Sequence, residues 1–590
     1  MQLDVKHPAI DEVFRDFYEV PQFQREYVWK SEQVEALLSD ALEALFDENG
    51  SATQSEYFIG SIVAYRDGDV FQLIDGQQRI TTLFISLCAF RDRRNDLHDS
   101  VPLKTLERMI QDEEDDKNGI PRIRLRLKPL YEDAGEILQL IAEGKPAPPA
   151  KNLPNSARNM LDAYSAAYEF LEEQFGDDID KLRTFQANLT QRVRLVRIQT
   201  GSVSDALRIF ETINDRGVGL NALDLLKNLL FRQAQQDKFD RLTGIWKEMV
   251  HTIEKTKKGE KPLRFLRYFV LSRYPDARKN GKPLTEDDLY EWLSENQDTI
   301  GISNDPVGYA KELLDSARLY QQHVSQPRSH LGHIYQLSAR ARQHLIIMLA
   351  TDGLTSEELD VVGFQLEKLF VGFILAKEPT KALDVIFANA APVLRSFIRT
   401  TPANSDRLDL LRHHLTAWLR PEIIKRLQRI EAALDSLSLE RKTACRFVLC
   451  RIAQHVEKMA DCQVAGIDHY WGYHIEHILP NHPTAEQKAS FDKPAEYDSY
   501  KQRLGNLTLL EQSINCAIGR DFFADKRPHY QKSALFMTKS LTQSQAVGTA
   551  SAFTKTAQLL PTFSDWSSAS IDARQQHIKQ LAIDTWGFTS

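Results

Sequence analysis

Two histidines flank a glutamate in the short apolar run HIEHILP, residues 474–480, which ends in a proline. Imidazole nitrogens and carboxylate oxygens bind metals, and imidazole can also move a proton near neutral pH. As a regular strand, the run would place His474 and Glu476 on one face and His477 on the other. A turn or bulge here would instead bring Glu476 and His477 to the same centre. The residues alone leave both arrangements open.

Two asparagines follow in RLGNLTLLEQSINCAIGRDFFADKRPHY, residues 503–530. Asn506 precedes a predicted strand, LTLL, and Asn515 lies on the helix predicted after it. A carboxylate and an amide oxygen can hold a hard divalent cation, while a neighbouring imidazole takes a proton from attacking water. The combination indicates metal-assisted phosphodiester hydrolysis. Each half alone would also fit a hydrogen-bonded histidine and an asparagine turn.

Three polar clusters interrupt apolar surroundings in the first half of the chain: FQREYVWK (23–30), LIDGQQRITTL (73–83) and FETINDRGVGLNALDLLKN (210–228). In the second cluster, Asp75 and Gly76 separate a predicted strand from a predicted helix, where unpaired backbone N–H groups can face an anion. Arg79 lies one turn into that helix and can reach the same anion. Gln77 and Gln78 would supply amide donors, so the pattern is typical of a phosphate site.

The third cluster pairs a polar turn with a cation through Asn214 and Arg216. A capped helix with solvated polar residues would explain any one of the three clusters equally well. The sequence holds no GxxxxGK[ST] motif, so a nucleotide site built from these clusters would not be a Walker P-loop.

The elements that must position these residues follow from periodicity. Apolar residues at helical spacing predict a helix over 31–46, and two strands joined by the turn RDGD predict a hairpin over 57–74. From about residue 235 to 460 the pattern is almost entirely helical. In a strand predicted at 120–129, four cations share one face. That face fits either a solvated edge strand or a track that faces phosphates.

Length and composition limit the number of domains and the kinds of partner and metal ligand that the chain can have. With 590 residues the chain is too long for one core, so three or four domains are expected. The net charge of −8 does not decide for or against nucleic acid, because acidic enzymes can carry local basic tracks. The five cysteines form no CxxC pair, so a catalytic metal would be held by oxygen and imidazole. No apolar run is long enough for a bilayer and no secretory signal opens the sequence, so we expect a cytoplasmic protein without a membrane partner.

The segments HIEHILP, GNLTLLEQSIN and ADKRPHYQKS together resemble the HNH, or ββα-metal, nuclease fold. The resemblance is to the form without a zinc knuckle found in the GmrD half of GmrSD-type restriction enzymes. It implies that His477 is the general base and that Glu476 and Asn515 are metal ligands. It also implies that Asn506 orients the His477 strand.

The same resemblance implies contacts with nucleic acid. His474 would be an outer ligand or a phosphate contact, and Lys526 or Arg527 would hold a DNA phosphate. Asn515 stands where the commonest HNH pattern has its last histidine. An amide oxygen is a harder ligand than imidazole, so Mg²⁺ or Mn²⁺ is expected rather than Zn²⁺.

The three N-terminal clusters, in their residues and in their order along the chain, resemble the GmrS-type NTPase domain, which is similar to the ParB-like fold. That resemblance implies nucleotide binding and hydrolysis with Asp75, Gly76, Gln77, Gln78 and Arg79 at the centre. The pocket would be completed by Gln24, Arg25, Asn214 and Arg216. The fused order is that of single-chain GmrSD enzymes and of SspE-like phage-defence proteins.

The expected architecture is multidomain α+β. It consists of a ParB-like mixed α/β domain at residues 1–235, a helical middle region at 236–430, and an HNH nuclease domain with flanking helices at 431–590.

The resemblance implies a nucleotide-responsive, metal-dependent DNA endonuclease or nickase that restricts foreign, modified phage DNA. Its cofactors would be Mg²⁺ or Mn²⁺ and a nucleoside triphosphate. One alternative is a regulatory protein that senses nucleotide or DNA and keeps a non-catalytic HNH remnant, and another is a defence effector that cuts RNA. The sequence leaves open which modification and which nucleotide are recognised, whether one or both strands are cut, and whether the chain forms a homo-oligomer.

Overall fold

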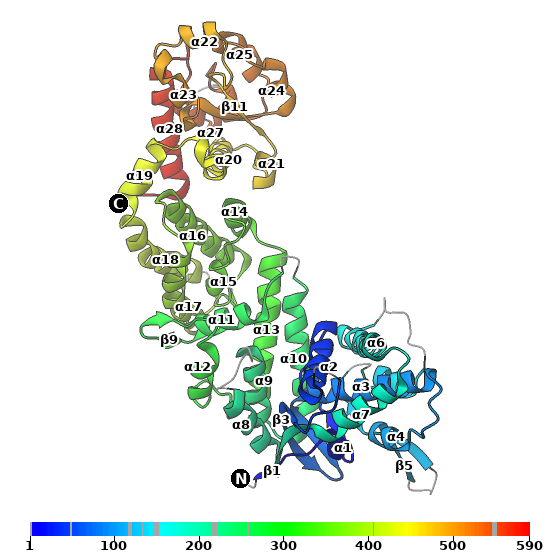
Figure 1. The fold of residues 1–590 in the computed structure, drawn as a ribbon. Helices are drawn as coiled ribbons and strands as arrows, with labels where there is room; N and C mark the ends of the chain where they lie inside the picture. The colour runs from blue at the N-terminus through cyan, green and yellow to red at the C-terminus, as the bar shows by residue number, and fades with distance from the viewer. Residues whose placement is uncertain are drawn as a thin grey trace. The chain divides into compact units, whose positions relative to one another are not determined.

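The computed structural model describes residues 3–47, 50–115, 121–131, 134–145, 153–214, 222–256, 259–404, 406–544 and 551–589, with the backbone alone at residues 115, 204 and 211–214. The chain forms two compact units (Figure 1), Met1–His251 with Glu286–Leu314 and Thr252–Thr285 with Asp315–Ser590. The second unit contains helices of the predicted middle region together with the C-terminal part, so these two regions do not form separate compact units. The predicted boundaries at residues 235 and 430 therefore stay predictions.

The strands are β1 (Leu3–Lys6), β2 (Phe17–Val20), β3 (Tyr57–Asp67), β4 (Val70–Asp75), β5 (Gln111–Asp115), β6 (Pro121–Leu125), β7 (Leu127–Pro129), β8 (Val193–Thr200), β9 (Arg278–Lys279), β10 (Lys282–Pro283), β11 (His474–His477) and β12 (Leu507–Leu510). The earlier helices are α1 (Ile10–Val13), α2 (Ser31–Leu45), α3 (Gln77–Asp96), α4 (Lys104–Ile110), α5 (Ala134–Ala142), α6 (Asn155–Phe175), α7 (Ile179–Arg192), α8 (Val203–Asn214), α9 (Ala222–Gln233), α10 (Phe239–Glu254), α11 (Pro262–Arg273), α12 (Leu289–Glu295) and α13 (Pro306–Ser325). The later helices are α14 (Ser329–Leu337), α15 (His344–Met348), α16 (Ser356–Leu375), α17 (Leu383–Thr400), α18 (Arg407–Ile424), α19 (Leu427–Asp435), α20 (Lys442–Met459), α21 (Ile467–Trp471), α22 (Ala485–Ser490), α23 (Tyr497–Tyr500), α24 (Gln512–Ile518), α25 (Phe523–Tyr530), α26 (Phe536–Lys539), α27 (Ala552–Leu559) and α28 (Ser568–Trp586).

A mixed six-stranded sheet in the order β1-β8-β3-β4-β2-β7 organises the first unit. The predicted hairpin is confirmed, because β3 and β4 pair antiparallel with Asp67 opposite Val70 across the turn. Strand β8 pairs parallel with β3, and β2 pairs parallel with both β4 and β7. The combination of this sheet with its many helices confirms the α+β class.

Helix α3 is the central helix of the first unit. Its buried residues include Ile80, Phe84, Leu87 and Phe90, and it packs against α4, α5, α6 and α7. Apolar residues occur around most of the circumference of α3. The helix is therefore buried on several sides and not on one face only. This packing fixes the start of α3, at Gln77, beside the end of β4.

The strand predicted at 120–129 is broken at Arg126, so the continuous basic face does not form. Strand β6 pairs with β5, whereas β7 joins the six-stranded sheet beside β2. Arg126 is only 7% exposed and donates to the carbonyl of Arg15 at 2.9 Å. Arg124 forms an ion pair with Glu114 at 2.9 Å. Arg124 and Arg126 therefore bind groups of the protein itself, so these two cations do not form part of one continuous basic face.

The second unit is helical up to β11, except for the short β9–β10 pair. Strands β11 and β12 pair antiparallel in an unbroken register, with His474 opposite Leu510 and His477 opposite Leu507. The strand arrangement is therefore confirmed, and the bulge is wrong: His474 and Glu476 share one face of β11. Helix α24 follows β12 directly, which completes a strand–strand–helix order. In the described part of the chain, none of the helices has the length and apolar character needed to cross a membrane.

Candidate functional site

Residues from all three N-terminal clusters line one cavity of about 280 Å³ in the first unit. The lining residues are Phe23, Gln24, Arg25, Trp29, Asp75, Gly76, Gln77, Gln78, Arg79, Phe210, Asp224, Lys227 and Asn228. The structure therefore brings together three segments that lie far apart in the sequence. It does not describe Arg216 or the side chain of Asn214, so those two expectations lie outside the described residues.

The cavity lies where β4 turns into α3, and a glycine makes the turn possible. Gly76 is the N-cap of α3 and has φ +83°, in the left-handed region that favours glycine. A Cβ at this position would lie 2.4 Å from Cγ2 of Ile62, so a side chain would also collide with β3. The close approach directs the start of α3, with its unpaired N–H groups, toward the cavity.

The side chain of Arg79 is held against β3. Arg79 donates from Nη1 to the carbonyl of Ser61, and its guanidinium lies 3.2 Å from a Cβ built on Gly60. Burial raises the pKa of Asp75, while the charge of Arg79 and the N–H of Gly76 oppose that rise. The carboxyl and the guanidinium thus face one cavity and affect each other electrostatically.

Two glutamines of the site have different roles. Gln78 accepts from the N–H of Val28 at 2.9 Å and donates to the carbonyl of Glu26 at 2.9 Å. Its amide therefore holds the first cluster in place, which differs from the expectation that it faces an anion. Gln24 is 5% exposed, and its Nε2 has no hydrogen-bond partner among the described residues. A buried hydrogen-bond donor without a partner destabilises the folded protein. The described lining of the cavity therefore lacks an acceptor for Nε2 of Gln24.

Helix α9 supplies cavity residues that the sequence analysis did not select. Asp224, Lys227 and Asn228 line the cavity from one face of this helix. Burial lowers the pKa of Lys227 to about 8, although Asp224 acts in the opposite direction. Burial likewise raises the pKa of Asp224, against the charges of Arg25 and Lys227. The signal was present in LLKNLLF, residues 225–231, where a charged and an amide residue interrupt an apolar run.

His477 ends β11 in the second unit, and one of its ring nitrogens is unpaired. Burial and the charge of Lys526 lower the pKa of His477 to about 4, whereas a hydrogen bond with Gln502 opposes this shift. Among the described residues, the buried Nε2 of His477 has no hydrogen-bond partner. A neutral imidazole with an unpaired nitrogen can accept a proton.

Glu476, the neighbouring residue, is buried and firmly held. Its Oε1 accepts from Lys526 Nζ at 2.7 Å and from the Tyr530 hydroxyl at 2.9 Å. Burial raises the pKa of Glu476, and the contacts with Lys526 and Tyr530 oppose the rise. Both contacts engage Oε1, which leaves Oε2 as the oxygen for a cation.

Lys526 differs from its predicted role. It is 0% exposed, and its Nζ donates to Glu476 and to the carbonyls of His477 at 2.8 Å and Ile478 at 3.3 Å. A side chain in this position orients the Glu476 carboxylate and the end of β11 and does not face solvent. The expected phosphate contact is therefore wrong for Lys526, while Arg527 remains half-buried and donates to Thr542 at 3.1 Å.

Asn506 ties the chain just after His477 to β12. Its Oδ1 accepts from the N–H of Leu479 and from the indole of Trp566 at 2.8 Å, and its Nδ2 donates to the carbonyls of Leu479 and Lys501. The residue is fully buried. This is the contact expected of a residue that orients the His477 segment.

Helix α28 supports the same segment from outside. Arg574 donates to the carbonyls of Gly505 at 2.7 Å and Leu507 at 2.6 Å. A Cβ on Gly505 would lie 2.3 Å from the carbonyl oxygen of Ile571, so only glycine allows this approach. The position of Asn506 thus depends on α28.

Asn515 reaches β11 from α24. Its Nδ2 lies 3.4 Å from Nδ1 of His474, and His474 shares a face of β11 with Glu476. The structure therefore places the predicted ligand Asn515 on the Glu476 side of the strand. The amide Oδ1 is the atom left for a hard cation.

Two sequence models of one family match the chain. The model described as GmrSD restriction endonuclease, N-terminal domain, matches residues 8–231, and the model described as GmrSD restriction endonucleases, C-terminal domain, matches residues 424–581. No curated protein matches the chain. The first match contains the whole cavity lining, and the second contains β11, β12 and α24.

Proposed function

This chain belongs to the GmrSD restriction endonuclease family, and from that premise we propose that it is an HNH-type DNA endonuclease or nickase. The observation that carries the proposal is the buried Nε2 of His477, which has no hydrogen-bond partner among the described residues, at the end of a strand whose other face holds the carboxylate of Glu476. Nε2 takes the proton of a water molecule that attacks the phosphodiester. Gln502 acts on the ring of His477 in the direction that raises its pKa, which favours proton uptake.

The donor set suits a hard divalent cation, Mg²⁺ or Mn²⁺. Oε2 of Glu476 and Oδ1 of Asn515 would hold it, and when bound it would stabilise charge on the phosphate and the leaving oxygen. Lys526 neutralises part of the buried charge of Glu476 and fixes its Oε1. Asn506 keeps the segment after His477 at a constant distance from β12.

The cavity of the first unit supports a nucleoside triphosphate site that regulates cleavage. Arg25, Arg79 and Lys227 supply cations for phosphates, and the start of α3 supplies backbone donors. Asp75 and Asp224 suit the magnesium ion that accompanies a triphosphate. The unpaired Nε2 of Gln24 supports a ligand with acceptor groups. Hydrolysis at this site would bias the nuclease between inactive and active states.

The proposed substrate is foreign DNA that carries a chemical modification. The deciding experiment is a cleavage panel of matched modified and unmodified phage DNA, with and without Mg²⁺, Mn²⁺, EDTA and each nucleoside triphosphate. Single-stranded RNA serves as the competing substrate. Cleavage of DNA that requires the metal supports the nuclease, whereas cleavage of RNA alone would contradict it.

Variants assign the chemistry to the site. His477→Ala should abolish cleavage and leave far-UV circular dichroism unchanged, while His469→Ala, which alters an exposed histidine on α21, serves as the matched control. Asn515→Ala should raise the metal concentration needed for half-maximal cleavage. Wild-type cleavage by His477→Ala would refute the assignment of the base.

A further inference from the structure

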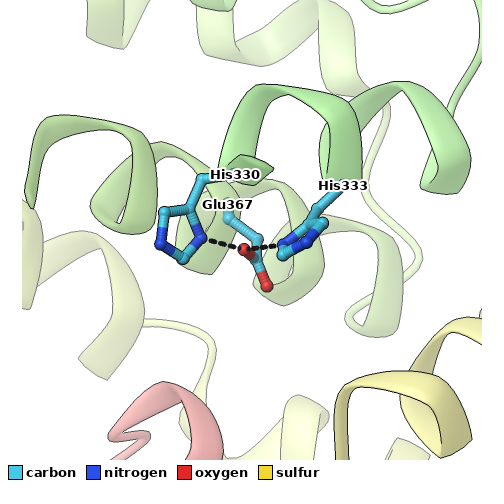
Figure 2. A group of neighbouring side chains, drawn as sticks. All are labelled: His330, His333 and Glu367. Atoms are coloured by element: carbon cyan, nitrogen blue, oxygen red, sulfur yellow. Dashed lines mark hydrogen bonds and ion pairs between the residues drawn. The ribbon is translucent and has the colours of Figure 1, made fainter. Parts of the chain in front are cut away.

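A second group of metal-binding side chains lies in the second unit, away from β11 and β12 in sequence. His330 and His333 on α14 and Glu367 on α16 offer ligand atoms that all lie within 4.8 Å of one another. Figure 2 shows both imidazoles directed at the carboxylate, and each Nδ1 lies 2.6 Å from the same oxygen, Oε2. The three ligand atoms thus converge on one point.

The spacing of the histidines on α14 and a glycine on α16 allow the three side chains to meet. His330 and His333 are three residues apart, so they project from the same face of α14. Glu367 lies one turn after Gly363 on α16, and a Cβ on Gly363 would lie 3.1 Å from Cβ of His330. The small residue lets α14 approach α16 closely enough for both imidazoles to reach the carboxylate.

Two further residues orient the carboxylate without using the oxygen that faces the histidines. Arg451 on α20 donates from Nε to Oε1 of Glu367 at 2.7 Å, and Trp586 on α28 donates to the same oxygen at 2.8 Å. Gln454 accepts from Arg451 at 2.6 Å and so fixes the guanidinium. Outer contacts of this kind commonly hold metal-binding carboxylates in position.

We propose that His330, His333 and Glu367 bind one Zn²⁺ ion. Two imidazoles and one carboxylate form a donor set that Zn²⁺ uses in proteins. A metal-binding imidazole binds through one ring nitrogen and carries its proton on the other, so Nδ1 would bind the ion and Nε2 would carry the proton. Without a metal, both Nδ1 atoms must instead donate to one oxygen that is already fully buried.

A cavity of about 890 Å³ beside the cluster gives a metal ion access. His330 and His333 line it together with Arg451 and His455, and His330 keeps 21% of its side chain exposed. The open side of the ion would face this cavity. Since Glu367 is contacted from α14, α20 and α28, the bound ion would connect α14 and α16 with α20, which packs beside β12, and with α28, which packs against Leu504–Asn506. The site does not depend on the proposed nuclease activity.

Cobalt provides the test, because tetrahedral Co²⁺ with nitrogen and oxygen ligands absorbs visible light. The full chain carrying Asn515→Ala, which weakens the proposed nuclease metal site, is stripped with a chelator and titrated with Co²⁺ and then with Zn²⁺. We expect one absorbing Co²⁺ per chain, displaced by one Zn²⁺, and a higher melting temperature with Zn²⁺. In the same background, His330→Gln and His333→Gln should each lose the absorbing ion.

The matched control is His455→Gln, which alters a histidine of the same cavity outside the cluster and should keep the ion. Circular dichroism checks that each variant is folded, and His330→Gln tests the site even if the more deeply buried His333→Gln does not fold. The absence of an absorbing Co²⁺ in the folded parent would overturn the proposal. So would a folded His330→Gln chain that keeps the ion, or melting temperatures that respond to Zn²⁺ equally in parent and variants.

Discussion

Asn506 hydrogen-bonds to both backbone groups of Leu479: its Oδ1 accepts from the N–H at 2.7 Å and its Nδ2 donates to the carbonyl at 3.0 Å. The carbonyl of Asn506 also accepts from the N–H of Ile478 at 3.0 Å. A side chain thereby continues the pairing of β11 with β12 beyond His477. The geometry of the residue proposed as the base depends on this extension.

Asn506→Asp tests that dependence with almost no change in volume. The new carboxylate places an oxygen against the carbonyls of Leu479 and Lys501, where Nδ2 donated before. We expect DNA cleavage to fall by about 10–100-fold, as for other groups that orient a catalytic residue. DNA binding should change little, and the metal concentration for half-maximal cleavage should stay that of wild type. A metal response like that of Asn515→Ala would remove the distinction between the two asparagines.

Lys526→Met tests the role of the buried lysine. Removal of one partner of a buried ion pair leaves Glu476 uncompensated, which costs about 3–5 kcal/mol. We expect a clear fall in melting temperature, measured by calorimetry, together with loss of cleavage. Arg527→Ala, at the next position, is the comparison and should lower DNA affinity at low salt without lowering the melting temperature. If Lys526→Met kept its stability and lost only DNA affinity, the buried placement would be refuted.

Asp75→Ala and Arg79→Ala test the link between the two proposed activities. Both should lose nucleotide turnover, because each removes a charge that faces the cavity. Both should also alter cleavage of the cognate modified DNA, although the nuclease residues are intact. Phosphate release and cleavage are measured side by side, with Arg66→Ala, an exposed arginine on β3, as the control. Turnover at background with every nucleotide in wild type would refute the NTPase, and unchanged cleavage in the variants would refute regulation separately.

Lys227 gives the nucleotide site a predicted pH dependence. Its pKa is lowered to about 8, so the side chain is charged below that pH and neutral above it. Triphosphate affinity should therefore fall as the pH rises through about 8. Lys227→Arg keeps its charge over this range and should remove the fall. Fluorescent-nucleotide titrations at several pH values measure the effect, and an identical slope for Lys and Arg would show that another group titrates.

Periodicity predicted the local elements well. Helix α2 and the β3–β4 hairpin matched their predicted ranges because their signals lie within a few consecutive residues. The pairing of β11 with β12 agrees with the two strands that the resemblance to the ββα fold implies, whereas the residues alone had left a strand and a bulge open for residues 474–480. The family expectation agrees with both domain matches.

Contacts between residues that are far apart in the sequence could not be predicted from local patterns. Lys526 looked like a surface cation because its partner Glu476 is fifty positions away, and the sequence alone gives no sign that they meet. Glu367 was not noticed for the same reason, since its four donors come from α14, α20 and α28. Lys227 could have been found, because a lysine inside an apolar helical run needs a polar environment.

The approach of α28 to Gly505 has a consequence for how the protein is made. The ribosome synthesises β11, β12 and α24 before α28, yet Arg574 must donate to Gly505 and Leu507 to fix the segment that carries Asn506. A nascent chain that ends before Ser568 therefore lacks the support that holds its proposed cutting residues in register. A translation product that ends before α28 would therefore not hold Asn506, and with it the segment after His477, in place.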